Sequence, residues 1–529
     1  MSLQWELNRE LPVDTAALGQ AILSEKNAYR QIGDRFNELF PPEEEFAPLY
    51  STMGRGAIAP LLMALVTVFQ MLEKAPDRLA AESVVSRIDW KYALHLPLTY
   101  TGFHFTDLGA FRERLLEHHQ ERIVFDAHFV RLKVLGLIKQ RGKMRTDSTH
   151  VLGVVERLSQ LELIAESLRV ALQAVTEVAT EWVSQAIPAA FRDVYDLRQS
   201  EYGLSEAEVR GKLVQVGQDG FWFLAQLDAA PEMVRRLREI EVLRAVMGQQ
   251  FPQGPGQPPA TKRPTGSDVI ESPHEPEVRY GTKRGKSWVG YKMQLTETCD
   301  EDLPHLIVDI EPTNALANDS PELPRIQARL EEQDILPGEQ QVDQGYMSGK
   351  NLVESTKKGI ELMGIPLADT QGPAGFHQTD FQIDEAQRQA RCPAGYANTV
   401  WAERTPHDDG PPAIHVRFDA ATCQRCPHFG RCTTSKQGRS LTLHPYRAAL
   451  EARRAEARTE AFRDKLHPRA GIESTISELV RRHQARSARY RGKAKLRLQG
   501  YFTAVAANLK RLMRWLAQTQ PFTTAIATS

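Results

Sequence analysis

The segment Met144–Val155 reads MRTDSTHVLGVV, and the architecture of the chain can be worked out from it. Its threonines and valines favour an extended strand. Aspartate is rare in strands, so Asp147 in the middle of this segment needs a reason for its position. A strand has to pair with other strands, and the rest of the chain must supply them.

Strands and helices alternate after residue 270. The predicted strands are Trp288–Thr296, Leu306–Ile310, Gln340–Asp343 and Ile360–Ile365, and the predicted helices between them are Pro321–Ile335 and Ser348–Lys358. The first two strands are expected to form a hairpin across the turn-rich residues 299–304. A hairpin followed by alternating helix and strand indicates a mixed α/β sheet.

Changes in periodicity and composition divide the chain into seven segments. They are a helical domain at 1–135, the first strand of a core at 140–155, a helical insertion at 156–248, a linker rich in Pro and Gly at 249–270, the rest of the core at 271–370, a cysteine-bearing insertion at 371–445 and C-terminal helices at 446–520. Within the helical insertion, apolar spacing predicts one long amphipathic helix that continues to Pro188. The fold class is therefore α/β with several insertions.

The chain has 529 residues, of which 41% are hydrophobic, and it is long enough for two to four domains. Its longest apolar run, Ala57–Leu72, is shorter than the about 20 residues that span a bilayer and predicts a buried helix. The chain opens without a signal peptide. We therefore expect a cytoplasmic protein with no membrane segment.

The net charge of −1 hides a strongly basic segment near the end of the chain. Between Ile476 and Leu516 the only acid is Glu478, whereas the basic residues are Arg481, Arg482, Arg486, Arg489, Arg491, Lys493, Lys495, Arg497, Lys510, Arg511 and Arg514. A solvated helical face is the simpler explanation of a charge run. This density nevertheless favours binding to a nucleic acid, because each cation set against a phosphate releases counterions.

Three acids are candidates for chemistry. Asp147 lies within a predicted strand, and Asp343 ends another, just before a turn. The third comes from a helix predicted to start after Pro468, where a rotation of about 100° per residue places Glu473 and Arg469 on the apolar face and Glu478 on the opposite, solvent-facing side. A buried ion pair between Arg469 and Glu473 is the structural alternative.

Carboxylates from two strands and a helix suit phosphoryl transfer. Mg²⁺ prefers oxygen ligands and keeps open positions for water and phosphate. Two such ions, Mg²⁺ or Mn²⁺, about 4 Å apart can activate an attacking oxygen and stabilise the leaving one.

Four of the five cysteines are clustered in the sequence. Cys392 belongs to a C-P-x-G turn, and Cys423, Cys426 and Cys432 form a C-x₂-C-x₅-C pattern with His428 between the last two. Four thiolates are enough for one structural Zn²⁺ that could fold an insertion short of apolar core. Free thiols are the alternative, and Cys299 lies outside the cluster.

These motifs resemble a known family. Arg145–Val151 (RTDSTHV) and Val342–Tyr346 (VDQGY) resemble the first-aspartate and second-aspartate motifs of bacterial insertion-sequence transposases of the DDE type. Arg469–Ile476 (RAGIESTI), Arg489–Lys495 (RYRGKAK) and Ala507–Leu512 (ANLKRL) resemble the family's glutamate helix and the part that follows it. The family's tyrosine before the arginine and lysine after the glutamate are replaced here by Leu466 and Val480.

The resemblance implies an RNase H-like catalytic core in which Asp147, Asp343 and Glu473 bind two Mg²⁺ or Mn²⁺ ions. It implies cleavage of double-stranded DNA at terminal inverted repeats, transfer into target DNA and a homodimer on paired ends. Residues 83–115 resemble the family's N-terminal helical domain, expected to help recognise the ends. Expected DNA contacts are Arg469, Arg481, Arg482, Arg486, Arg489, Arg491, Lys493 and Lys495.

Two alternatives remain open from the sequence. One is an RNase H-like nuclease that hydrolyses DNA without joining it. The other is a zinc-bearing DNA-binding protein without enzymatic activity, for which the cysteines and the basic segment would be sufficient.

Overall fold

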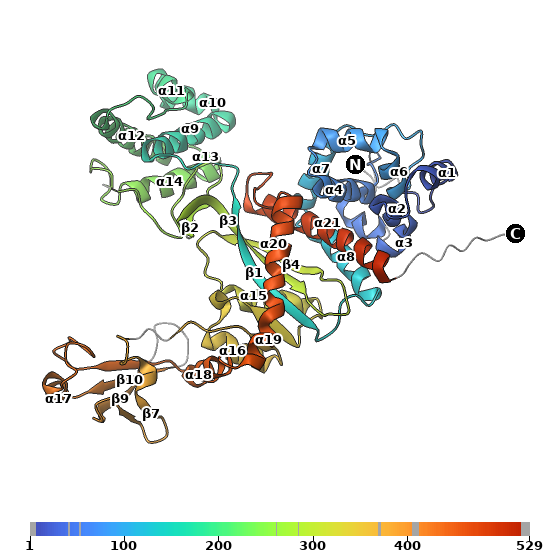
Figure 1. Ribbon diagram of the computed structural model, residues 1–529. Helices are drawn as coiled ribbons and strands as arrows, with labels where there is room; N and C mark the ends of the chain where they lie inside the picture. Colours follow the sequence, from blue (N-terminus) through green and yellow to red (C-terminus); the bar gives the residue numbers. More distant parts are fainter. Residues whose placement is uncertain are drawn as a thin grey trace. The chain divides into compact units, whose positions relative to one another are not determined.

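The computed structural model describes residues 7–40, 43–51, 54, 56–260, 262–283, 285–368, 372–404 and 412–519. The chain forms two compact units, drawn in Figure 1. The first contains Met1–Lys139, Asp147–Ala317 and Gly471–Ser529, and the second contains Gln140–Thr146 and Asn318–Ala470. Each unit is therefore built from segments that lie far apart in the sequence.

The first unit begins with a helical bundle. Its elements are α1 (Val13–Ile22), α2 (Ala28–Asp34), α3 (Phe36–Leu39), η1 (Glu43–Leu49), α4 (Pro60–Glu73), α5 (Asp77–Ser86), α6 (Ile88–Ala93), α7 (Thr106–Glu117) and α8 (Ile123–Val134). Helix α4 starts with Pro60 at its first position, ends at Lys74 in the left-handed conformation, and is buried along nearly its whole length. The predicted buried helix over residues 57–72 is thus confirmed.

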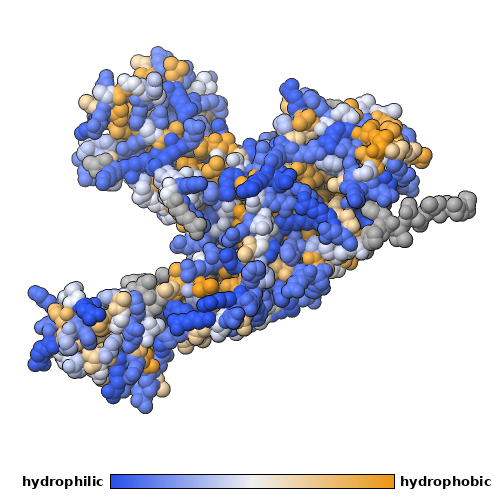
Figure 2. Space-filling view, in the orientation of Figure 1, coloured by the Kyte–Doolittle hydropathy of each residue, from blue (hydrophilic) through white to orange (hydrophobic). Residues whose placement is uncertain are grey.

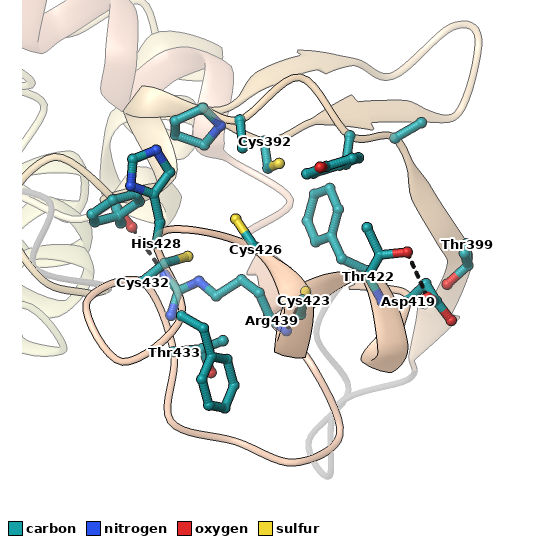
Figure 3. A pocket seen from close by; sticks show the side chains of 17 residues that line it. Cys392, Thr399, Asp419, Thr422, Cys423, Cys426, His428, Cys432, Thr433 and Arg439 are labelled. Carbon is teal, nitrogen blue, oxygen red and sulfur yellow. Dashed lines mark hydrogen bonds between the residues drawn. The ribbon is translucent and has the colours of Figure 1, made fainter.

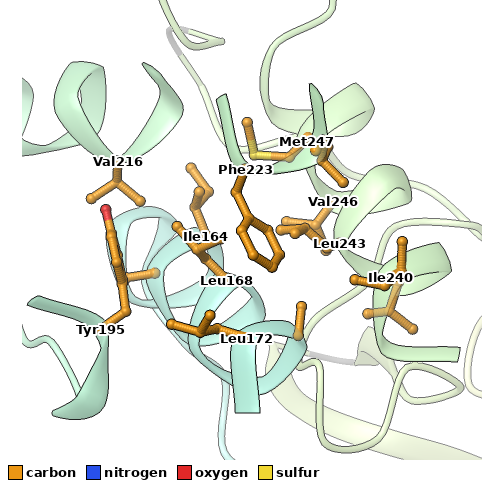
Figure 4. Packing of buried hydrophobic residues seen from close by; sticks show 14 of the residues in the cluster. Ile164, Leu168, Leu172, Tyr195, Val216, Phe223, Ile240, Leu243, Val246 and Met247 are labelled. Atoms are coloured by element: carbon orange, nitrogen blue, oxygen red, sulfur yellow. The ribbon is translucent and has the colours of Figure 1, made fainter. Parts of the chain in front are cut away.

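In the sequence, a second helical body follows the first strand and precedes the rest of the sheet. Its elements are α9 (Gln160–Val178), α10 (Thr180–Ala186), α11 (Ala189–Asp196), α12 (Glu206–Gln226), η2 (Leu227–Ala229), α13 (Glu232–Arg235) and α14 (Arg238–Gln250). Figure 4 shows Phe223 between α9 and α14, beside Leu168 and Leu243. The single helix predicted up to Pro188 is wrong, because the backbone leaves the helical region at Ala179, where φ is −144°.

A buried ion pair anchors α9. Glu166 is 3% exposed and accepts hydrogen bonds from Arg169, at 2.8 and 2.9 Å, and from His274, at 2.6 Å. Burial by itself raises the pKa of Glu166, but the hydrogen bonds from Arg169 and His274 outweigh it and lower the pKa to about 2. The segment that leads into the sheet is therefore tied to α9 by charge as well as by apolar contact.

The strands of the first unit are β1 (Lys143–Leu152, from Asp147 onwards), β2 (Arg279–Lys283), β3 (Lys286–Thr298) and β4 (Ile307–Asn314). Strand β3 pairs antiparallel with both β2 and β4, so the predicted hairpin is confirmed, whereas β2 was not predicted. Gly290 of β3 has a φ of +155°, and a Cβ there would lie 2.1 Å from the carbonyl oxygen of Val151. Only glycine allows β3 to approach β1 so closely.

The second unit contains the first residues of β1. Residues 143–146 pair in parallel with β5 (Glu339–Val342), and β5 pairs in parallel with β6 (Glu361–Met363). Because β1 belongs to both ladders, the strand order is β2-β3-β1-β5-β6, with β4 on β3. The helices are α15 (Glu322–Glu332), η3 (Gln344–Tyr346), α16 (Gly349–Lys357), α18 (Arg447–Glu456), α19 (Glu460–Leu466) and η5 (His467–Ala470). The predicted mixed α/β sheet is confirmed.

The cysteine-bearing insertion of the second unit contains strands that were not predicted. They are β7 (Gln382–Asp384) paired with β8 (Gln389–Arg391), and a three-stranded sheet of β9 (Asn398–Arg404), β10 (Ala413–Phe418) and β11 (Ser440–Leu443), with the short turns η4 (Gln378–Asp380) and α17 (Ala420–Arg425). Its buried apolar core is small: Phe381, Ala390, Val416, Phe418, Leu441 and Leu443. Cys392, Cys423 and Cys432 pack against this core, half-buried.

Helices α20 (Gly471–Arg482) and α21 (Lys493–Thr519) close the first unit. Helix α21 packs against α4, α8 and β4. The side chain of Asn508, fully buried in α21, bonds both backbone groups of Ile307, accepting its N–H at 2.8 Å and donating to its carbonyl at 2.9 Å. The C-terminal helix is therefore a core element of the unit that starts the chain.

On the face of the first unit that Figure 2 shows, hydrophobic residues gather over α1 among other places. On this helix Val13 is 85% exposed and Ile22 is 58% exposed. Among the described helices, none combines the length and the apolar character needed to cross a membrane.

Replacement of Glu166 by glutamine is expected to loosen the helical insertion. At pH 7 the loss of one partner of a buried ion pair costs about 3 kcal/mol. Folding lowers the pKa of Glu166, so its carboxylate contributes its full share to the stability of the fold above pH 4.5, the ordinary pKa of glutamate. This stabilisation is lost as the pH falls from there towards about 2. The difference between wild type and variant should therefore be larger at pH 7 than near pH 4.

Hydrogen exchange of the α9 amides measures this difference. The matched control is Glu206→Gln, since the pair of Glu206 with Arg210 lies on the same insertion with side chains 85% and 72% exposed. Equal exchange rates of the α9 amides in the two variants at pH 7 would contradict the stabilising role of the Glu166 ion pair.

Candidate active site

The first two candidate acids follow a registered pair of residues. Thr146 of β1 lies opposite Val342 of β5 in a parallel ladder. Asp147 is the next residue after Thr146, and Asp343 is the next after Val342. Each acid therefore directly follows a residue of the last register pair between β1 and β5.

A buried polar network fixes this end of the ladder. Gln327 of α15 donates to Gln340 of β5 at 2.9 Å, and Gln340 donates to the hydroxyl of Thr146 at 3.0 Å. Gln327 also donates to Ser355 of α16 at 2.9 Å. All four side chains are buried, and a satisfied network of this kind admits one register only. The strand position that precedes each acid is thus rigidly defined.

Asp343 is accessible and lies near a guanidinium group. Its carboxylate is 53% exposed, and its Oδ1 is 4.0 Å from Nη1 of Arg469 in η5. The chain turns into η3 directly after it, where Gly345 passes so close to Asp319 that a Cβ would lie 2.9 Å from its Oδ2. Asp147 is half-buried, and its Oδ1 accepts the N–H of Ser148 at 2.7 Å.

Glu473 lies in the first turn of α20 and is exposed. The sequence-based prediction placed Glu473 on the apolar face and Glu478 towards solvent, and the burial is the reverse. Glu478 is only 17% exposed, because α21 covers its side of the helix. The extrapolation failed because the buried face of α20 includes Thr475 and extends towards Glu478, and Arg511 of α21 bonds both side chains. Exposure leaves Glu473 reachable by a ligand, and a helix N-terminus favours a carboxylate.

A cluster of charges under α20 holds this helix in place. Arg511 of α21 contacts Glu297 of β3 at 2.7 Å, and Glu297 is completely buried. Arg511 also donates to Thr475 at 2.8 Å and to Glu478 at 2.9 Å, two residues of α20. Thr475 in turn donates to Glu297 at 2.7 Å. The helix that carries Glu473 is thereby bonded to a strand and to the last helix.

Several residues of the basic segment have structural roles. Arg486 donates to Thr149 at 3.1 Å and to the carbonyl of His150 at 2.6 Å, and Arg489 donates to the carbonyl of Ala75 at 2.7 Å. Arg497 forms an ion pair with Glu311 at 2.8 Å, and Arg511 belongs to the cluster just described. The interpretation of the whole segment as one DNA-facing surface is therefore too broad.

The remaining basic residues are open to solvent to different degrees. Arg481, Arg482 and Arg491 are exposed, whereas Arg469, Lys493 and Lys495 are half-buried. Their predicted contacts with DNA stay a prediction.

The four clustered cysteines line one pocket of the second unit (Figure 3). The thiols of Cys392, Cys423, Cys426 and Cys432 are all free, and His428 lies at the same pocket. The backbone N–H of Arg439 approaches Sγ of Cys423 at 3.5 Å. Burial raises the pKa of Cys432, and the other three thiols add to this rise while Arg439 opposes it.

The arrangement of these side chains is not that of a metal centre. In the part of the chain that the structure describes, no three His, Cys, Asp or Glu side chains are grouped so that they could hold a metal ion. The thiols share a pocket but do not form a ligand set as they stand. The zinc prediction therefore remains a prediction.

Comparison with known protein families gives two matches. Residues 391–513 match the family described as "Transposase DDE domain", and residues 18–114 match "Transposase domain (DUF772)". The first match includes the four cysteines and Glu473, but neither Asp147 nor Asp343. The comparisons with curated proteins and with solved structures gave no match. The resemblance found in the sequence motifs is confirmed by the two families.

Replacement of Arg511 by methionine is expected to destabilise the first unit strongly. It leaves Glu297 buried without its cationic partner, which costs about 3–5 kcal/mol. Thermal unfolding followed by circular dichroism should show a lower midpoint. Arg514→Met is the matched control, because Arg514 lies one turn further on, is 63% exposed and reaches Glu478 only at 4.0 Å. The double variant Glu297→Met with Arg511→Met should recover part of the loss.

Proposed function

Because the two family matches identify an insertion-sequence transposase of the DDE type, we propose that the chain cleaves DNA at the ends of its own element and transfers them into target DNA. Terminal inverted repeats and target DNA, both double-stranded, are the proposed substrates. A homodimer on paired ends is the proposed assembly, as the family resemblance implies.

The proposed catalytic residues are Asp147, Asp343 and Glu473. The observation that carries this choice is the register of Thr146 with Val342, after which both aspartates follow at once. A second observation supports Glu473: Arg469, four residues ahead of it, lies beside Asp343. The core is proposed to be RNase H-like, since an antiparallel pair, β3 and β4, adjoins parallel strands β1, β5 and β6.

The donor types suit Mg²⁺ or Mn²⁺, because carboxylate oxygens are hard ligands, and the three acids would have to draw together around the ions, since no three such side chains are grouped for a metal among the described residues. Two such ions would supply a polarised phosphate and an activated oxygen nucleophile. The chain's own residues have separate tasks. Arg469 places a positive charge 4.0 Å from Asp343, and the network from Gln327 to Thr146 holds the strand that carries Asp147.

Substitutions Asp343→Asn and Glu473→Gln test the mechanism. Each should reduce cleavage of labelled terminal-repeat duplexes with Mg²⁺ by at least about 10²-fold, because a ligand of the ions is lost. DNA binding, followed by fluorescence anisotropy, should be nearly unchanged. The matched control is Asp302→Asn, since Asp302 is 67% exposed and pairs with Lys139 at the surface.

Product analysis in the same assay separates the alternatives. Joined strands identify a transposase, whereas cleaved strands without joining identify a nuclease. DNA binding by the wild type with no metal-dependent product would contradict the proposed activity and leave a non-enzymatic DNA-binding protein.

We also propose that Cys392, Cys423, Cys426 and Cys432 close around one structural Zn²⁺, which requires their thiols to move nearer to one another than they stand in the structure. Support comes from four free thiols at one pocket and from the small apolar core beside them. Small domains short of apolar core are often completed by a metal.

Elemental analysis of the purified protein should find about one zinc per chain, and Cys426→Ser should lose it, because a closed structural site needs four ligands. Cys299→Ser is the control, since Cys299 is buried elsewhere in the first unit. Absence of zinc from the wild type purified in its presence would refute the site.

A further inference from the structure

We propose that Lys283 and Lys286 of the β2–β3 hairpin, together with His150 and Arg486, form a DNA phosphate-binding surface outside the active site. This inference rests on the proposed function, and its ligand is the sugar-phosphate backbone of a DNA strand. The residues Lys283, Lys286 and His150 were not among the DNA contacts expected from the sequence.

The hairpin places two like charges directly opposite each other. Lys283 and Lys286 are register partners in the antiparallel ladder, and both are exposed. Like charges in such a pair are destabilising, so the arrangement has a cost for folding. Neither lysine has a carboxylate partner among the residues described in the structure. A bound anion would remove this cost.

The base of the hairpin is stiffened by contacts along both strands. The guanidinium of Arg157 lies 3.8 Å from the ring centre of Tyr280, and the hydroxyl of Tyr280 donates to Ser287 at 2.8 Å. The ring of Trp288 covers Gly281, where a Cβ would lie 2.5 Å from it. The two lysines are therefore presented on a fixed support, which lowers the entropy lost when they meet a phosphate.

Strand β1 brings two more groups to the same place. The imidazole of His150 stands 5.0 Å from the ring of Trp288, and Arg486 donates to the carbonyl of His150 at 2.6 Å. Burial lowers the pKa of His150, and the positive charges of Arg486, Lys283 and Lys286 lower it further. Three cations thus act on one ring, and the neutral ring keeps an N–H that can donate to a phosphate oxygen.

His150 is separated from the candidate acids along β1. It follows Asp147 by three residues, which is about 10 Å along an extended strand. Side chains three residues apart point to opposite faces of a strand, so His150 is not a catalytic residue. The surface would hold DNA away from the scissile phosphate.

The test is the salt dependence of DNA binding by the full chain. Binding of a fluorescein-labelled duplex is followed by anisotropy over a series of NaCl concentrations. The slope of log K against log salt is about −0.9 per phosphate neutralised, so the variant Lys283→Ala with Lys286→Ala should reduce the slope by about 1 to 2 units and weaken binding. The variant with arginine at both positions should keep the slope of the wild type.

The matched control removes two exposed cations elsewhere in the first unit. Lys212 and Arg236 lie on the helical insertion, and their double alanine variant should bind with the wild-type slope. If the hairpin variant keeps the full slope, or if the control loses as much, the inference fails while the proposed function stands. If the wild type does not bind the duplex at all, the proposed function itself fails.

Discussion

The buried ion pair between Arg511 and Glu297 is the interaction on which the first unit depends. Glu297 has no exposure to solvent, and burying a carboxylate is costly unless a cation and hydrogen bonds compensate it. The guanidinium of Arg511 donates to Glu297 of β3, and it also donates to Thr475 and Glu478 of α20. A middle strand and the last two helices are therefore stable only together.

The same helix shows how structural and functional acids are separated. Glu473 and Glu478 lie five residues apart in α20, yet the first is exposed and the second is covered by α21. A carboxylate enclosed by Arg511 has its oxygens occupied and cannot accept a new ligand. The exposed acid keeps that capacity, which is why the proposed metal ligand and the structural anchor can share one helix.

The core strands could be predicted from the sequence, but the partners of the charged residues could not. The strands at residues 144–155 and 340–343 were predicted because β-branched composition and the alternation with helices are local properties. The burial of Arg511 depends on Glu297, more than two hundred residues away, and no local pattern reports such a partner. Strands β2 and β7 to β8 are short and lack a marked apolar alternation, so they were missed for a different reason.

The candidate site, too, could be predicted from the sequence only in part. The two aspartates were found because each follows a strand in a recognisable motif, and the register of Thr146 with Val342 then explains their common level. The choice of Glu473 stays a prediction although its supporting geometry was wrong, because the partner that covers Glu478 comes from α21, outside the local pattern. Lys283 and Lys286 could not be singled out beforehand, because their meaning depends on the pairing of β2 with β3.

The position of α21 also affects how the chain folds during its synthesis. Helix α4 is made before α21 during synthesis, and the two helices pack against each other. The bundle that contains α4 therefore keeps apolar surface uncovered until α21 has been synthesised. A polypeptide that stops before α20 lacks both this covering helix and Glu473.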